Sequence, residues 1–173
     1  MGTRVSGAAA VVLAAALACN GGLEPTPVCG RSFVGICGTV TFQGQEPEST
    51  QGVFIVAYPT FPQSRTDLLN NFLPRPPLES LLRPFTNPQF YAVQLPSGRY
   101  EWVLAVWLKQ GAVPTPTNAD TVLREAGFYR DETDPAQPGI VTVPSGARTD
   151  SIDFLIDFGN MRRVCDYFPP CPP

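Results

Sequence analysis

Residues 91–109 read YAVQLPSGRYEWVLAVWLK, a pattern that predicts two β-strands joined by a tight turn. Pro96 presets the backbone for the turn, and Gly98 is suited to a left-handed conformation there. After the turn, apolar side chains occupy both faces of the second strand, with Trp102 on one face and Trp107 on the other. Because a strand that is apolar on both faces needs a cover on each side, we expect it at the centre of a layered β-structure.

Other segments of the chain show the patterns of further strands. Residues 36–42 alternate, and residues 53–58 (VFIVAY) form a continuous apolar run that ends at a proline. In residues 151–158 (SIDFLIDF) every second side chain is apolar, which directs Asp153 and Asp157 to solvent. Weaker strand patterns follow at 126–129, at 140–143 and, as an edge strand, at 161–167. About seven strands without a sustained helical repeat predict an all-β sandwich.

Residues 60–88 are much longer than the loops that join the strands of a plain sandwich. They contain two apolar clusters, at 68–73 and 78–85, and the prolines between them leave each cluster room for only a turn or two of helix. We expect an irregular, short-helical insertion that folds over the outer face of the central strand and covers Trp107. The alternative is a flap that binds a ligand or a partner.

The first 18 residues, MGTRVSGAAAVVLAAALA, have the composition of a signal peptide. Arg4 precedes an apolar run that ends at Ala18 and is too short to cross a bilayer. Cys19 follows at once, and this junction resembles the signal of a bacterial lipoprotein, in which the cysteine becomes lipidated after cleavage. An ordinary secretory signal cleaved near Ala18 is the alternative.

The lipoprotein resemblance implies a division of the chain and a location. Residues 1–18 are then the signal peptide, residues 19–28 a lipid-anchored linker rich in Gly and Pro, and residues 29–173 a single domain with a cysteine-containing tail at 160–173. The protein would be exported and held on a membrane of the bacterial cell envelope by its lipid. Asn20 resembles the class sorted to the outer membrane, facing the periplasm or the cell surface.

Five cysteines become an even set once Cys19 is assigned to the lipid. Cys29 and Cys37 lie near the start of the predicted domain, and Cys165 and Cys171 lie after its last strong strand pattern, at 151–158. In an exported protein four such cysteines favour two disulfides, with local pairing and pairing of the two chain ends both open. A metal site is the alternative, although the spacings lack the CxxC pairs that zinc prefers.

Four segments carry a resemblance to a known family: GTVTF (38–42), VFIVAYP (53–59), YAVQLPSGRYEWVLAV (91–106) and SIDFLIDF (151–158). Together they resemble the carboxypeptidase regulatory-like domains, which share a transthyretin-like (prealbumin-like) sandwich. LPSGRY at 95–100 is similar to the LPxGxY hairpin of that family. The resemblance implies a seven-stranded Greek-key β-sandwich. Family members that are enzymes rely on a separate zinc domain or on histidines, and this chain has neither.

The absence of histidine excludes most hydrolytic mechanisms. Without an imidazole there is no Ser-His-Asp triad, no Cys-His pair and no HExxH zinc site. The chain has 12 Lys and Arg against 15 Asp and Glu, a formal net charge of −3, which argues against a nucleic-acid partner. We therefore expect a protein that is not an enzyme and that needs no cofactor.

Minor site candidates each have a plainer interpretation. The acidic run 130–134, with Asn118 and Asp120, offers oxygen ligands to calcium but lacks the regular spacing and glycine of a calcium loop. Trp102 and Trp107 lie on opposite faces of one strand, so they cannot form one platform for a sugar. The remaining candidates are Lys109, as half of a Ser–Lys pair, and Arg162 with Arg163, as contacts for phospholipid head groups.

The sequence therefore predicts a non-enzymatic, lipid-anchored envelope protein whose β-sandwich is a structural or protein-interaction module. Its expected partners are the membrane, through the anchor at Cys19, and an envelope protein or polysaccharide. The alternative is a module that binds a carbohydrate or a small ligand, which requires an exposed aromatic cleft.

Overall fold

The computed structural model describes residues 29–30 and 32–172, and in them the chain is built mainly of strands. The strands are β1 (Gly35–Gln43), β2 (Thr50–Tyr58), β3 (Gln89–Gln94), β4 (Gly98–Tyr100), β5 (Trp102–Lys109), β6 (Leu123–Phe128), β7 (Val141–Val143), β8 (Arg148–Thr149), β9 (Phe154–Asp157) and β10 (Arg162–Arg163). Two short helices, α1 (Arg65–Asn70) and α2 (Ala119–Val122), and a 3-10 turn, η1 (Val164–Asp166), complete the set. An all-β fold is confirmed, with ten strands in the described residues where seven were predicted.

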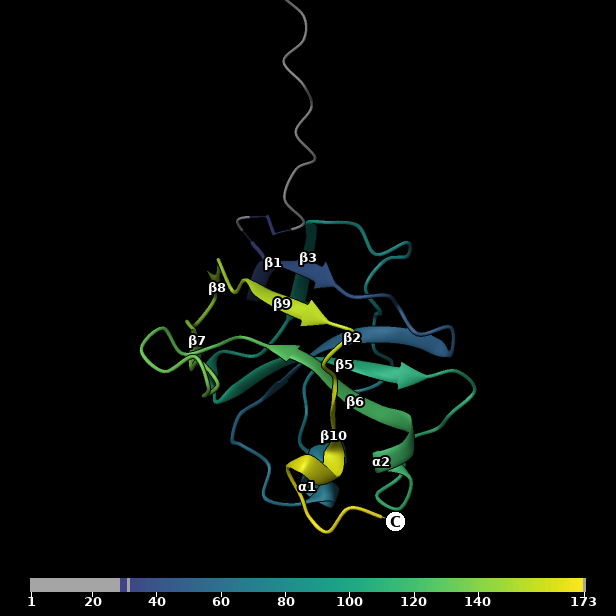
Figure 1. The fold of residues 1–173 in the computed structure, drawn as a ribbon. Coiled ribbons are helices and arrows are strands. Elements are labelled where there is room, and N and C mark those ends of the chain that lie inside the picture. Colours follow the sequence, from purple (N-terminus) through teal and green to yellow (C-terminus); the bar gives the residue numbers. More distant parts are fainter. Residues whose placement is uncertain (1–28, 31, 173) are drawn as a thin grey trace, which may run out of the picture.

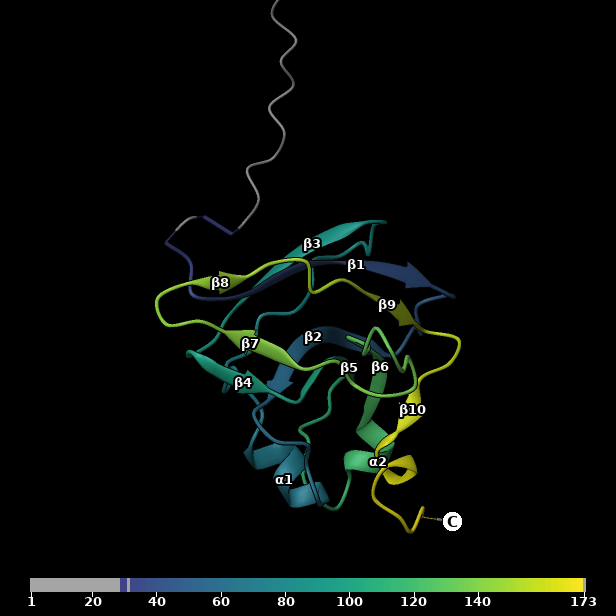
Figure 2. The same ribbon diagram turned by 90° about the vertical axis from the view of Figure 1, so that its left-hand side faces the viewer.

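Two layers of sheet form the body of the molecule (Figure 1). The first sheet has the order β3-β1-β8, with β9 also paired to β1, and the second has the order β10-β6-β5-β2. A short ladder of β4 and β7 lies at one end, as Figure 2 shows. Most pairs are antiparallel, but β8 and β9 run parallel to β1. The arrangement is that of a sandwich with one mixed and one antiparallel sheet.

The core of the sandwich is filled from both sheets. Ile36 and Ile156 of the first sheet and Val103 of the second have no solvent exposure, and all three belong to one apolar cluster. Trp107 is buried in the same cluster, where its Nε1–H donates a 2.7 Å hydrogen bond to Oγ1 of Thr50. The indole therefore packs between the sheets without leaving its one donor unpaired.

The last long strand pattern is also confirmed. Four apolar side chains of the segment SIDFLIDF (Ile152, Phe154, Ile156 and Phe158) are buried in the core between the sheets. Asp153 is exposed and Asp157 half-buried, as the period of two requires.

Strand β5 is central, between β6 and β2, and both of its faces are covered. Val103 and Trp107 face the first sheet, whereas Trp102 and Leu104 belong to a second apolar cluster on the outer face of the second sheet. The prediction that the two tryptophans lie on opposite faces of one strand is confirmed.

The predicted strand at 100–109 is interrupted at Glu101. The amide of Glu101 donates to the carbonyl of Tyr58 (2.9 Å), while its carboxylate accepts from the amide of Phe61 (2.9 Å). The residues before this point form β4, which pairs with β7. Tyr100 consequently packs in the core between the sheets although the plain alternation would place it beside Trp102.

The turn before β4 differs from the prediction at Gly98. The glycines with positive φ in the described residues are Gly35, Gly44, Gly111, Gly127 and Gly146. Gly98 instead opens β4 opposite Val143, so the ladder with β7 fixes its backbone.

At Gly127 the backbones of the two sheets approach each other closely. Its φ is +157°, and a Cβ placed on it would lie 1.9 Å from the carbonyl oxygen of Leu155 in β9. Only a residue without a side chain fits there, because any Cβ would overlap the backbone of the other sheet.

The insertion at 60–88 contains one helix, α1, as the prediction of short helical turns requires. Ser64 caps this helix, since its hydroxyl accepts from the amide of Asp67 at 3.1 Å. Farther along, Leu73 exchanges two backbone hydrogen bonds with Ala57, and the amide of Leu81 donates to the carbonyl of Val53. The insertion thus runs along the free edge of β2.

The insertion covers the outer face of the central strand, as predicted, but Trp102 and not Trp107 lies on that face. Leu68, Leu69 and Phe72 pack in the cluster of Trp102, whereas Trp107 points into the core cluster between the sheets, which Leu81 and Phe85 from the end of the insertion also join. The prediction that the insertion covers Trp107 is therefore wrong, because the first sheet already occupies that side.

The edge strand predicted at 161–167 is also wrong in most of its length. Only Arg162 and Arg163 pair with β6, and the chain then turns into η1. The carboxylate of Asp166 accepts from the amide of Arg163 at 2.7 Å, a capping contact that starts the turn and ends the strand.

The cysteines pair locally. Cys29 is bonded to Cys37, with 6.3 Å between their Cα atoms, and Cys165 is bonded to Cys171, with 4.8 Å. The predicted signal peptide, Cys19 and the linker lie outside the described residues. Within the described part of the chain, no helix has the length and apolar character needed to cross a membrane.

Candidate functional site

A cavity of about 440 Å³ lies on the outer face of the second sheet. Its floor is formed by β2 and β5, through Phe54, Val56, Tyr58, Trp102, Leu104, Val106 and Leu108. These residues are the ones that the alternation of the two strands turns away from the first sheet. We call this space the apolar cavity.

Segments that are far apart in sequence form the two walls of the apolar cavity. One wall comes from α1 and the insertion after it (Leu68, Leu69, Phe72, Pro76 and Leu78), and the other from the loop before α2, the start of β6 and the C-terminal segment (Val113, Pro114, Leu123, Arg124, Glu125, Arg163, Val164, Tyr167 and Phe168). Figure 1 and Figure 2 show both α1 and the C-terminal segment on the side of the second sheet away from β1 and β3.

The apolar cavity opens to solvent along one side. Phe54, Val106, Phe72 and Leu78 line it and are only half-buried, while the side chain of Val113 is 78% exposed. We call these five residues the mouth. The opposite end is closed, since Trp102 there is 1% exposed.

Aromatic rings close the end of the cavity at Trp102. Its ring centroid lies 5.5 Å from that of Tyr58, 4.8 Å from Phe61 and 5.2 Å from Tyr167. The hydroxyl of Tyr58 donates to the carbonyl of Leu68 at 2.6 Å. The Nε1–H of Trp102, by contrast, has no hydrogen-bond partner among the described residues. A buried donor without a partner is uncommon and costs about 1–3 kcal/mol.

Glu125 is the buried carboxylate of the cavity wall. Its Oε2 accepts a 2.8 Å hydrogen bond from the hydroxyl of Tyr167 and lies 3.9 Å from Nε of Arg162. Burial raises the pKa of Glu125, and the contacts with Tyr167 and Arg162 only partly oppose the shift. Burial and the nearby Glu125 also raise the pKa of Tyr167, so the phenol keeps its proton and remains the donor.

Two arginines line the cavity near its C-terminal wall. Arg124 donates through Nη1 to the carbonyls of Asp120 and Leu123, at 2.5 and 2.7 Å. Burial and the charge of Arg163 lower the pKa of Arg124. Arg163 is itself paired with Asp166, at 3.4 Å. Both guanidinium groups thus already have partners within the protein.

The proposed calcium ligands are not brought together. Asp131 accepts from the hydroxyl of Thr133 and from the amides of Thr133 and Asp134 in a local turn, and these bonds lower the pKa of Asp131. Asp120 is instead paired with Arg65 of α1, at 3.1 Å. Within the described residues, Asp120 does not join the acidic run in a cluster of metal-binding groups.

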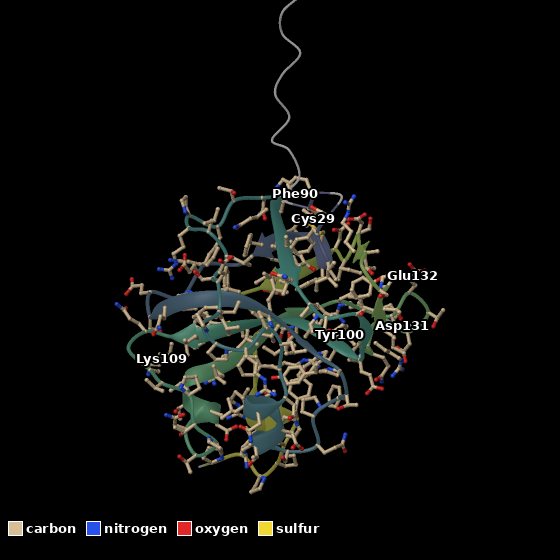
Figure 3. All side chains as sticks on the ribbon, turned by 180° about the vertical axis from the view of Figure 1, so that it is seen from behind. Cys29, Phe90, Tyr100, Lys109, Asp131 and Glu132 are labelled. Carbon is tan, nitrogen blue, oxygen red and sulfur yellow. A yellow bond between two sulfur atoms is a disulfide. The ribbon has the colours of Figure 1, made fainter. Side chains whose placement is uncertain are left out.

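The other predicted candidates lie apart from one another. Figure 3 shows Lys109 at one edge of the molecule and Asp131 with Glu132 at the opposite edge. Arg162 and Arg163 are exposed on β10. Cys165, Asp166 and Cys171 lie close enough to suggest a metal site, but the two sulfur atoms are bonded to each other.

Neither tryptophan offers an exposed ring to a sugar. Trp107 is 6% exposed inside the sandwich, and Trp102 is 1% exposed at the closed end of the apolar cavity. The exposed aromatic cleft that a carbohydrate module requires is therefore not formed by these two rings.

Sequence reasoning missed the apolar cavity itself and the role of Glu125 and Tyr167. The only signal was the insertion at 60–88, which was too long for a plain loop and carried apolar clusters without an assigned surface. Comparison of the chain with protein-family models, with curated proteins and with solved structures found no significant match.

Proposed function

We propose that the protein is a non-enzymatic binding module that holds a small apolar ligand in the apolar cavity. The observation that carries this proposal is a space of about 440 Å³, lined almost entirely by apolar side chains and open at one side. Its volume lies within the usual range of ligand pockets, and a few polar groups in an apolar lining are typical of such sites.

Packing energetics support the same function. Protein interiors are close-packed, and empty space in them lowers stability in proportion to its volume. Between the sheets, Val103 and Ile156 have no solvent exposure and belong to one buried apolar cluster. A space of about 440 Å³ on the other face of β5 therefore favours a ligand-binding role over a purely structural one. It also gives the insertion at 60–88 a function, because that insertion supplies one wall.

We further propose that the module is exported and lipid-anchored at Cys19 in the bacterial cell envelope. The apolar run before Cys19 and the junction that follows it support the anchor. The pairs Cys29–Cys37 and Cys165–Cys171 support an oxidising compartment. A Greek-key, transthyretin-like relationship of the sandwich belongs to the same proposal, and the sequence LPSGRY at 95–100 is its main support.

Binding of an uncharged fluorescent probe tests the ligand site. The full chain with Cys19→Ser is titrated with N-phenyl-1-naphthylamine, whose emission rises in apolar surroundings. We expect saturable binding, and Val106→Phe at the mouth should weaken it about tenfold or more by filling the space. The matched control is Leu155→Phe, since Leu155 is 43% exposed on β9 in the other sheet. Equal affinity of both variants, or no saturable binding, would exclude the site.

Metabolic labelling tests the anchor separately. Cells that produce the chain are grown with radioactive palmitate, and the protein is recovered from the membrane fraction. We expect label on the wild-type chain and none on Cys19→Ser, which should leave the membrane fraction. Label that persists without Cys19 would refute the anchor and would leave the ligand site untouched.

A further inference from the structure

We infer that the outer edge of β3 is a surface for self-association, to which β3 of a second copy of the chain adds in the antiparallel direction. The first sheets of the two copies then form one continuous sheet. The inference is independent of the ligand proposed for the apolar cavity.

Strand β3 is the outermost strand of the first sheet. Among the described residues it pairs with β1 alone, and Figure 2 shows it at the upper border of the molecule. The edge strand β2 of the second sheet differs, because Leu73 and Leu81 of the insertion bind its backbone. The chain therefore covers one edge of its sandwich and leaves the edge at β3 open within the described part.

The backbone groups of alternate residues in β3 point away from β1. The amide of Leu95 donates to Val34 beside β1 at 3.3 Å, whereas the carbonyl of Cys37 faces away from β3 and accepts from Ile152 at 3.1 Å. Ala92 lies opposite Cys37, so it also faces away from its partner strand. The outward N–H and C=O groups consequently belong to Phe90, Ala92 and Gln94. No described residue forms a hydrogen bond with them.

These three residues are complementary to a second copy of themselves. In an antiparallel pair with a twofold axis at Ala92, each Ala92 faces the Ala92 of the other copy, and each Phe90 faces a Gln94. Every outward N–H then meets an outward C=O. A register shifted by two residues would leave some of these groups without a partner.

The composition of β3 permits this pairing. Its sequence, QFYAVQ, has no charged residue and no proline, although edge strands that stay unpaired commonly carry them. Pro88 and Pro96 flank the strand and cannot donate a backbone N–H, which limits the pairing to β3 itself. Phe90 lies at the border of the molecule (Figure 3), and its side chain is 60% exposed. Contact with the second copy would remove part of this apolar surface from water.

Sedimentation velocity over a series of protein concentrations tests the association in the full chain with Cys19→Ser. We expect a monomer–dimer equilibrium. Ala92→Pro removes the N–H at the centre of the edge and should weaken the dimer about tenfold or more. Proline is tolerated on edge strands, and this N–H has no partner among the described residues. The matched control Ala92→Ser keeps the N–H and should change the dissociation constant by no more than about twofold.

A pair of charge variants tests the register. Ala92→Lys and Ala92→Glu each place like charges opposite one another across the twofold axis, so each variant alone should dimerise about threefold more weakly or worse. In a mixture of the two variants, the opposite charges face each other. The mixture should therefore associate more tightly than either variant alone.

Amide exchange tests the same edge without a substitution. The amides of Phe90, Ala92 and Gln94 should exchange more slowly as the protein concentration rises. The amides of Tyr91 and Val93 face β1 and should be protected at every concentration.

Three results would count against the inference. A chain that stays monomeric, with fast exchange at Phe90, Ala92 and Gln94 throughout, would overturn it. A dimer that Ala92→Pro leaves intact would also overturn it, because the copies would then meet through another surface. A mixture of the Lys and Glu variants that associates no better than either alone would overturn the twofold pairing at Ala92. None of these results bears on the ligand site.

Discussion

The hydroxyl of Tyr167 donates a 2.8 Å hydrogen bond to Oε2 of Glu125 and so joins the C-terminal segment to β6. Both residues line the apolar cavity. The bond therefore attaches the C-terminal wall of the cavity to β6. Few backbone hydrogen bonds do so, because β10 pairs with β6 through only two residues before the chain turns into η1.

Removal of this hydroxyl should destabilise the protein. Tyr167→Phe leaves the buried carboxylate of Glu125 without its main donor, and we expect a loss of about 1–2 kcal/mol in the free energy of unfolding. Urea denaturation measures the loss. The matched control is Tyr129→Phe, because the half-buried Tyr129 makes no side-chain hydrogen bond within the described residues, and its change should stay within about 0.5 kcal/mol. Equal losses in the two variants would contradict the role of the bond.

Stability should depend on pH through Glu125. Burial raises the pKa of this carboxyl above its unfolded value of 4.5, so the native state binds its proton more tightly than the unfolded state does. The stabilisation is full below pH 4.5 and is lost as the pH rises through the raised native pKa. Glu125→Gln removes the titration but keeps an oxygen that can accept from Tyr167.

The expected measurement is a difference curve. Wild type and Glu125→Gln are unfolded in urea at several pH values between 4 and 8, and the stability of the wild type is subtracted from that of the variant. The difference should increase with pH across this window. A flat or falling difference would show that the native pKa of Glu125 is not raised.

The close approach at Gly127 should be intolerant of a methyl group. Gly127→Ala places a Cβ 1.9 Å from the carbonyl oxygen of Leu155, which forces the two sheets apart. We expect a loss of about 2–3 kcal/mol in the free energy of unfolding. Gly98→Ala is the control, since nothing lies within 4 Å of a Cβ there, and its effect should stay within about 0.5 kcal/mol. Thermal or urea unfolding measures the free energy of unfolding of both variants, and equal losses in the two would contradict the close contact at Gly127.

Each disulfide should join two cysteines that are close in sequence. Peptide mapping without reductant should recover Cys29 linked to Cys37 and Cys165 linked to Cys171. Peptides that join the two ends of the chain would contradict the structure. Replacement of Cys165 and Cys171 by serine should cost about 2–3 kcal/mol, because the closed loop is short. The same variant should weaken probe binding, since Val164 and Phe168 belong to the cavity wall.

The layered β-structure could be predicted because strand periodicity is a local property. The alternation from Ile152 to Phe158 requires only that one face is buried, and the structure confirms it. The interruption at Glu101 could not be predicted in this way. It depends on hydrogen bonds to Tyr58 and Phe61, which come from another part of the chain.

The site could not be predicted for a related reason. Both faces of β5 read as apolar, so the sequence did not show whether Trp102 or Trp107 faces the other sheet. The prediction therefore placed the wrong tryptophan on the face that the insertion covers. A cavity forms where side chains from segments distant in sequence do not fill the space between them. The residue pattern of a single strand therefore does not predict it.

The path of the insertion along β2 limits how a ligand reaches its site. Leu73 and Leu81 hydrogen-bond to the backbone of β2, so lifting this segment would expose an unpaired strand edge, which invites self-association. Exchange of ligand should therefore proceed through the mouth, by rotation of side chains such as Phe54 and Phe72, while the backbone stays in place. Uptake and release of the proposed ligand would then be fast in comparison with unfolding and would not expose the edge of β2.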